Sequence, residues 1–132
     1  HPIHVSDRPF SDGLLCTALC VYGKRYSGIC SDIIREVFPK CNDVRRFGSA
    51  ALELCYLAQG LCDLYFEYKV NAWDYSAAYL VLTEAGGILT GRDGEKLGFD
   101  RPTILVGANN ETNHRILSEI VGRHTKPDPY ED

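Results

Sequence analysis

The sequence of 132 residues contains no methionine, a single tryptophan and no excess of positive charge. No segment approaches the roughly 18 consecutive apolar residues of a membrane-spanning helix, which excludes that class of protein. With 14 basic and 18 acidic side chains the formal net charge is −4. Proteins that bind nucleic-acid phosphates usually present a basic surface instead. We therefore expect a soluble protein that binds neither membranes nor nucleic acids.

The lack of methionine also bears on how the chain arises. It begins at His1, so an initiator methionine is missing. Either the chain is processed or it is a piece of a longer protein, and we expect a piece. Its composition, with 45% hydrophobic and 24% charged residues, is that of one ordinary globular domain.

Cysteines are numerous for a chain of this length: Cys16, Cys20, Cys30, Cys41, Cys55 and Cys62. Disulfides need an oxidising compartment, and no secretory signal precedes the domain. Zinc sites favour Cys-x2-Cys pairs, whereas the closest spacing here is Cys16-x3-Cys20 without a second pair. We expect reduced, buried cysteines in a cytoplasmic protein, with the disulfide and zinc interpretations left open.

Hydrophobic periodicity alternates between strand-like and helix-like segments along most of the chain. The predicted strands are residues 3–6, 14–19, 44–47, 61–68, 88–90 and 103–108. The predicted helices are residues 31–37, 49–59 and 74–85, and a last one that Asn110 caps and Gly122 follows. Strands alternating with helices predict an α/β or mixed α+β fold, a layered sandwich of helices and mixed sheet. Residues 1–122 form this domain, and residues 123–132, with two prolines, are expected to be a flexible tail.

Two of the predicted helices begin with residues that suit a ligand site. Asp74 opens the helix 74–85, where a carboxylate can cap the helix or hold a divalent cation beside a phosphate. Ser49 is a good N-cap, and the small residues Gly48 and Ala50 beside it allow a ligand to approach the backbone. Glu67 lies near the end of a strand and could equally be an exposed acid. Each residue therefore has an ordinary structural explanation beside the functional one.

Four sequence blocks resemble the C-terminal half of the inositol monophosphatase family. They are Arg45-Arg46-Phe-Gly-Ser-Ala-Ala-Leu-Glu-Leu-Cys-Tyr-Leu-Ala-Gln-Gly60, Asp63-Leu-Tyr-Phe-Glu67, Trp73-Asp74-Tyr-Ser-Ala-Ala and Glu84-Ala-Gly-Gly87. Their order and spacing match over about residues 40–110. The tryptophan–aspartate helix start followed by Glu-Ala-Gly-Gly is a specific signal.

The resemblance implies a magnesium-dependent phosphomonoesterase with alternating layers of helices and sheets, often dimeric. Asp74 matches a metal ligand, and Glu67 matches a residue that contacts substrate hydroxyls. Gly48, Ser49 and Ala50 match the segment that lies along the substrate, a phosphorylated polyol or sugar. The resemblance places no other catalytic residue in this half.

The remaining acidic motifs of the family, including Asp-Pro-x-Asp-Gly-Thr, belong to its N-terminal half and do not occur in these residues. Mg²⁺ catalysis of phosphate-ester hydrolysis needs ions fixed around the phosphorus, which one carboxylate cannot achieve. We expect an enzyme as the full-length protein, a homo-oligomer, with the isolated chain inactive and missing its N-terminal half.

Three different interpretations stay open beside this one. A bisphosphate nucleotidase or fructose-bisphosphatase-like enzyme lies within the same superfamily. A non-catalytic binding or assembly domain would keep the substrate face without the metal site, and a thiolate metal module would use the cysteines. If the phosphatase interpretation holds, Asp74, Glu67 and Ser49 should line one cleft, with the two carboxylates within about 12 Å, the span of one sugar phosphate in an ordinary pocket.

Overall fold

One mixed sheet of five strands forms the centre of the protein. The computed structural model describes residues 3–17, 26–70, 72–98 and 103–125, without the side chains of Lys69, Ala72 and Asp74. The strands are β1 (Leu14–Thr17), β2 (Asp43–Arg45), β3 (Leu64–Val70), β4 (Ile88–Thr90) and β5 (Thr103–Ala108). They lie in the order β2-β1-β3-β5-β4, with β1 parallel to β2 and β3, and β5 antiparallel to β3 and β4. The predicted mixed sheet is therefore confirmed.

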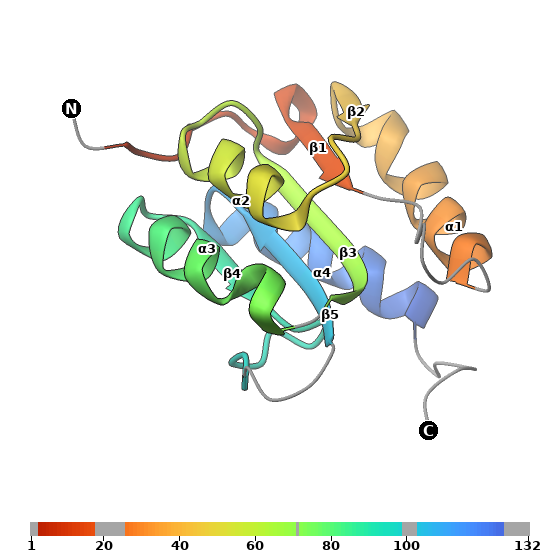
Figure 1. Cartoon of the computed structure of the whole chain (residues 1–132). Coiled ribbons are helices and arrows are strands. Elements are labelled where there is room, and N and C mark those ends of the chain that lie inside the picture. Colours follow the sequence, from red (N-terminus) through yellow and green to blue (C-terminus); the bar gives the residue numbers. More distant parts are fainter. Residues whose placement is uncertain (1–2, 18–25, 71, 99–102, 126–132) are drawn as a thin grey trace.

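Helices cover both faces of this sheet, which gives three layers (Figure 1). The helices are α1 (Ser27–Val37), α2 (Ala50–Ala58), α3 (Ala72–Glu84) and α4 (Glu111–Thr125), with short 3-10 helices η1 (Phe10–Asp12) and η3 (Phe38–Lys40). One core cluster joins α1 and α4 to the sheet, and a second joins α2 and α3 to its other face. None of the helices within the described ranges is long and apolar enough to cross a membrane.

The central strand β3 is buried on both faces, which explains its nearly continuous apolar sequence. Phe66 and Tyr68 belong to the core under α1 and α4, whereas Tyr65 belongs to the core under α2 and α3. Val70 also belongs to the second core, although a regular strand would turn it to the same face as Phe66. A register shift against β5 between Glu67 and Val70 accounts for this reversal, because a bulge changes which face later residues occupy.

Several predicted segments have different limits in the structure. Strand β2 covers residues 43–45 rather than 44–47, and α3 covers residues 72–84 rather than 74–85, so Asp74 does not open the helix. Residues 18–19 of the predicted strand 14–19 lie outside the described part of the chain.

Residues 3–6 form no strand: the Val5 N–H donates to the Ala85 carbonyl, and the Asn109 side chain donates to the Ser6 carbonyl. Helix α1 begins at Ser27 rather than at Ser31, which is exposed inside it. Strand β3 starts three residues later than predicted and continues to Val70.

The last helix is longer than the sequence indicates. Asn110 caps it as predicted, with Oδ1 accepting the Asn113 N–H at 2.9 Å. It does not end before Gly122 but continues to Thr125, where an Arg92 guanidinium N–H donates to the final carbonyl at 2.7 Å. This donor replaces the partner that a helix end otherwise lacks. Residues 126–132 of the expected tail lie outside the described part of the chain.

The cysteines within the described ranges are all free. Cys16, Cys30 and Cys62 are buried in the two cores, as predicted, whereas Cys41 and Cys55 are half-buried. Cys20 lies outside the described residues. Contact with the Cys16 thiol and burial raise the pKa of the Cys62 thiol, so Cys62 stays protonated.

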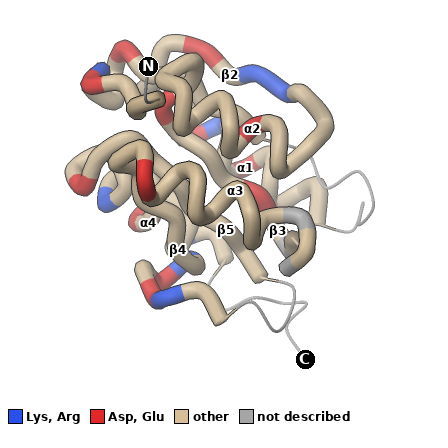
Figure 2. Tube along the Cα trace, turned by 60° about the vertical axis from the view of Figure 1, so that its left-hand side comes forward, with Lys and Arg blue, Asp and Glu red and all other residues tan. Residues whose placement is uncertain are grey.

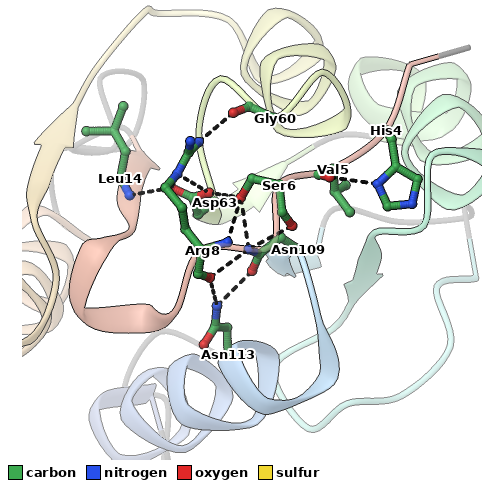
Figure 3. A network of polar contacts seen from close by, with 9 residues as sticks. All are labelled: His4, Val5, Ser6, Arg8, Leu14, Gly60, Asp63, Asn109 and Asn113. Carbon is green, nitrogen blue, oxygen red and sulfur yellow. Dashed lines mark hydrogen bonds and ion pairs between the residues drawn. The ribbon is translucent and has the colours of Figure 1, made fainter.

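A buried carboxylate, Asp63, ties the N-terminal segment to the start of two strands (Figure 3). Its Oδ2 accepts the Leu14 N–H at 2.8 Å, where β1 begins, and the Ser6 hydroxyl donates to Oδ1. The Arg8 Nε donates to both oxygens at 3.0 and 3.1 Å. The Asp63 backbone donates to the Leu14 carbonyl at 2.9 Å, so side chain and backbone together fix β3 against β1.

Two buried asparagines extend this network toward α4. The Asn109 and Asn113 amides each donate to the Arg8 carbonyl at 3.0 Å, and Asn113 also donates to the Asn109 side chain at 2.8 Å. A segment without secondary structure therefore has its carbonyls satisfied by side chains rather than by a strand ladder.

We expect Asp63→Ala to lower the free energy of unfolding by about 3 kcal/mol, because the Leu14 N–H and the Arg8 guanidinium lose their acceptor. Urea denaturation followed by circular dichroism measures the change. Asp32→Ala is the matched control, since Asp32 forms an exposed ion pair with Arg35 on α1. The urea midpoint of unfolding of this variant should stay close to that of the wild type. Equal effects of the two substitutions would contradict the structural role of Asp63.

Candidate active site

The start of α2 is a tight turn that ends in a helix cap. Gly48 has φ +84°, a left-handed conformation that glycine adopts without steric cost. Ser49 is the N-cap as predicted, and its hydroxyl accepts the Leu52 N–H at 3.2 Å. Ala50 is the first residue of the helix. Gly48 and Ser49 are exposed, so this backbone is open to a ligand.

One turn further along α2, Glu53 is fully buried. Its Oε2 accepts the Phe47 N–H at 2.7 Å, while Oε1 has no hydrogen-bond partner among the described residues. Burial raises the pKa of this carboxyl, and the Phe47 N–H opposes the shift by favouring the charged form. The side chain therefore reaches back across the glycine turn to the residue before it.

Glu67 lies on the face of β3 that α2 and α3 cover. It is half-buried and two residues from Tyr65, so both side chains project from the same face. The pKa of the buried Tyr65 hydroxyl is raised first by desolvation and then by the charges of Glu67 and Glu53. Glu67 and Glu53 therefore both act on the pKa of one hydroxyl.

Helix α3 starts two residues after β3 ends, with Asp74 as its third residue. The Asp74 side chain lies outside the described part of the structure. In Figure 1, α2 and α3 both begin at the end of the sheet where β3 finishes and run back along it together. The predicted segments 48–50 and 72–74 therefore lie at the end of the sheet where the last residues of β3 are found.

The predicted site is brought together in part. The α2 start and Glu67 lie on one face of the sheet, whereas a shared cleft that includes the Asp74 carboxylate stays a prediction. Within the described residues, no group of three or more His, Cys, Asp or Glu side chains could hold a metal ion. These residues therefore do not by themselves form a magnesium site.

An open groove of about 930 Å³ lies elsewhere, between residues 92–94 and the outer face of α4. None of the predicted site residues lines it. Arg45, the first residue of the sequence blocks that resemble the family, is exposed and pairs with Asp43. Its charge is therefore partly neutralised, as expected of a solvated strand end.

Glu53 and Tyr65 were not predicted from the sequence to belong to this region. Glu53 is the only charged residue in α2, and an acid in an otherwise apolar helix is a signal of a specific partner. Tyr65 carries no comparable signal, because tyrosine is common in buried strands and its neighbours are set only by the fold.

Comparison with known proteins supports the resemblance. A match to the inositol monophosphatase family covers residues 1–125. The chain belongs to this family. It is 40% identical over 83 residues to the Nus factor SuhB of Salmonella typhimurium, a match over 63% of this chain and 31% of that protein. It is 39% identical over 88 residues to the inositol-1-monophosphatase of Mesorhizobium japonicum, over 67% of this chain and 32% of that protein.

The fold agrees with this family membership. The structure of inositol monophosphatase from Anabaena superposes with a TM-score of 0.76 and 33% identity, covering 92% of this chain and 48% of that one. The chain thus spans about half of the solved structure and about a third of the curated relatives it matches. It therefore corresponds to part of an inositol monophosphatase fold.

We expect Gly48→Ala to lower the free energy of unfolding by about 1 kcal/mol, because alanine is strained at positive φ. A Cβ at this position would meet no atom within 4 Å, so crowding does not contribute. Gly48→Asn should lower the free energy of unfolding by less, since asparagine tolerates this conformation. Urea denaturation measures all variants.

Gly28→Ala is the matched control for this prediction. Gly28 lies inside α1, and a Cβ there also has open space. Alanine favours helices, so this variant should be more stable by about 0.5 kcal/mol. Loss of stability in both alanine variants, or in neither, would show that the turn at Gly48 is not strained by a side chain.

Proposed function

We propose that the chain is the C-terminal part of a magnesium-dependent phosphomonoesterase that hydrolyses inositol monophosphate or a related sugar or polyol phosphate. Membership of the inositol monophosphatase family over residues 1–125 carries this proposal. A relative named inositol-1-monophosphatase supports it. Because the chain spans only part of its relatives, the catalytic residues for in-line attack come from an N-terminal half.

In this proposal Asp74 supplies one carboxylate to the metal, Glu67 accepts hydrogen bonds from substrate hydroxyls, and Gly48, Ser49 and Ala50 contact the substrate. The exposure of Gly48 and Ser49 supports their role, as do the free N–H groups and positive dipole of a helix start, which attract a phosphate. When bound, Mg²⁺ would polarise the phosphate and activate water.

The outer faces of α2 and α3 support a missing half. Neither helix contains a lysine or arginine, and most of their length is uncharged in Figure 2, the exceptions being acidic. Leu52 on α2 and Leu80 and Val81 on α3 are exposed, and Leu80 is 62% exposed. We name these three side chains the α2–α3 face. A second layer of the full-length protein would bury this face and remove the cost of leaving it in water.

The remaining expectations belong to the same proposal: a cytoplasmic homo-oligomer whose partners are its phosphorylated substrate and its N-terminal half. The free cysteines of the described residues fit a reducing compartment. A non-catalytic assembly domain is the second candidate function. Several relatives carry the name Nus factor, which names no phosphatase activity, so we keep this candidate beside the enzyme.

We expect the isolated chain not to hydrolyse inositol phosphate or p-nitrophenyl phosphate with millimolar Mg²⁺, since Asp74 is the only family metal ligand that it carries. Joined to an N-terminal half of the family, it should turn over inositol phosphate. Asp74→Asn should then lower kcat on the order of a hundredfold or more. Asp32→Asn, on the opposite face of the sheet, is the control and should leave kcat unchanged.

Two outcomes would contradict the half-enzyme proposal. Turnover by the isolated chain that Asp74→Asn abolishes would show that this part is catalytically complete. An inactive assembly of both halves would instead favour the non-catalytic assembly domain.

The α2–α3 face gives a separate prediction about association. Leu80→Ser should weaken binding of the chain to a polypeptide carrying the N-terminal half by about tenfold or more, because a leucine loses its burial. Isothermal titration calorimetry measures the affinity. Phe38→Ser is the matched control: Phe38 is 51% exposed but follows α1 on the opposite face of the sheet. Equal losses in both variants would contradict docking at this face.

A further inference from the structure

The buried carboxylate of Glu53 has an environment that a stabilising side chain rarely has. It is fully buried, one of its oxygens has no partner among the described residues, and burial raises its pKa. A carboxylate left partly unsatisfied in a protein interior costs stability. An apolar side chain of similar size would avoid that cost. The backbone N–H groups of Phe47 and Gly48 and the charge of Arg46 favour the charged form and offset part of it, and the hydrogen bond from the Phe47 N–H has the largest effect of the three.

That hydrogen bond reaches the segment that leads into the proposed substrate contacts. Glu53 Oε2 accepts the Phe47 N–H at 2.7 Å, on the far side of the left-handed Gly48. The Glu53 N–H also donates to the Ser49 carbonyl at 2.9 Å. The first turns of α2 therefore hold both ends of the glycine turn, and the side chain of Glu53 holds the end before it.

An ordinary helix cap does not account for this contact. Ser49 already caps α2 through the Leu52 N–H. An acid that only complements the helix dipole would remain in solvent, where its charge costs little. Glu53 is instead turned inward, away from solvent, and its acceptor oxygen is used outside the helix.

Glu53 and Glu67, of which the second is proposed to contact the substrate, act on one buried group. The charges of both raise the pKa of the buried Tyr65 hydroxyl. Glu53 thus lies on the inner side of the α2 start, and Glu67 is near enough to act on the same group.

We propose that Glu53 is a positioning residue that fixes the backbone of residues 47–49 through the Phe47 N–H, and so sets where Gly48, Ser49 and Ala50 meet the substrate. The inference rests on the proposed function for its consequence in catalysis. The tether itself depends only on the structure of this chain.

Amide hydrogen exchange of the 132-residue chain, followed by NMR, tests the tether without any activity. Glu53→Leu removes the acceptor and Glu53→Asp withdraws it by one methylene, so in both variants the Phe47 amide should exchange about tenfold faster. In Glu53→Gln the side-chain carbonyl can still accept, and the rate should stay within about twofold of the wild type. If Glu53→Leu fails to fold, the exchange rate of Glu53→Asp is compared with that of the wild type instead.

The consequence for the substrate is tested in the chain joined to an N-terminal half. With inositol phosphate, Glu53→Leu and Glu53→Asp should raise KM about tenfold with a smaller change in kcat, and Glu53→Gln should restore KM. Leu57→Ala is the matched control, because Leu57 is a fully buried residue of α2 in the core. It should lower the stability and leave KM and the Phe47 exchange rate near wild type.

The two measurements separate the failure of this inference from the failure of the proposed function. If the wild-type assembly shows no phosphatase activity, the proposed function fails. The exchange rates alone then show whether Glu53 holds the Phe47 N–H. An unchanged Phe47 exchange rate in Glu53→Leu or Glu53→Asp overturns the inference. So does a Gln variant as impaired as the Leu variant, or an equal rise in KM for Leu57→Ala, which would indicate a merely structural role.

Discussion

The fold depends on one buried carboxylate. Asp63 lies immediately before β3, with none of its surface exposed, and accepts hydrogen bonds from the start of β1 and from the N-terminal segment. Parallel strands have no connecting turn that fixes their register, so β1 and β3 must be aligned by other contacts. Asp63 provides such a contact, with backbone and side chain both bound to Leu14. The guanidinium of Arg8 compensates the buried charge from the partly exposed side.

Most of the architecture could be predicted from the sequence, because it follows from local patterns. Strands β4 and β5 have the predicted limits, and Ser49, Gly60 and Asn110 occupy the predicted helix ends. Residues 3–6 were mistaken for a strand because they alternate in polarity as a strand does. Their partners are Asp63, the Ala85 carbonyl and Asn109, all distant in the sequence, and no local pattern reveals such contacts. The extension of α4 to Thr125 likewise depends on a distant donor, Arg92.

The candidate site could be predicted only in part, for a related physical reason. The residue types at a helix start and a strand end indicate where a ligand can bind, and the resemblance to the family named the residues. Neither shows that Glu53 turns inward or that the charges of two acids act on the Tyr65 hydroxyl, since these follow from packing. The face of β3 that Val70 occupies was also hidden, because the bulge after Glu67 interrupts the alternation.

The position of Glu67 follows from the same register that Asp63 fixes. Side chains alternate between the faces of a strand, so a slip of β3 by one residue would exchange the faces of Phe66 and Glu67. The carboxylate would then enter the apolar core under α1 and α4, and the phenyl ring would face the α2 start. The bulge comes only after Glu67, so it cannot correct such a slip before the carboxylate is placed. The Asp63 network, at the other end of β3, therefore helps to set which side chain of β3 lies on the side of α2 and α3, and a structural contact thereby bears on the proposed site.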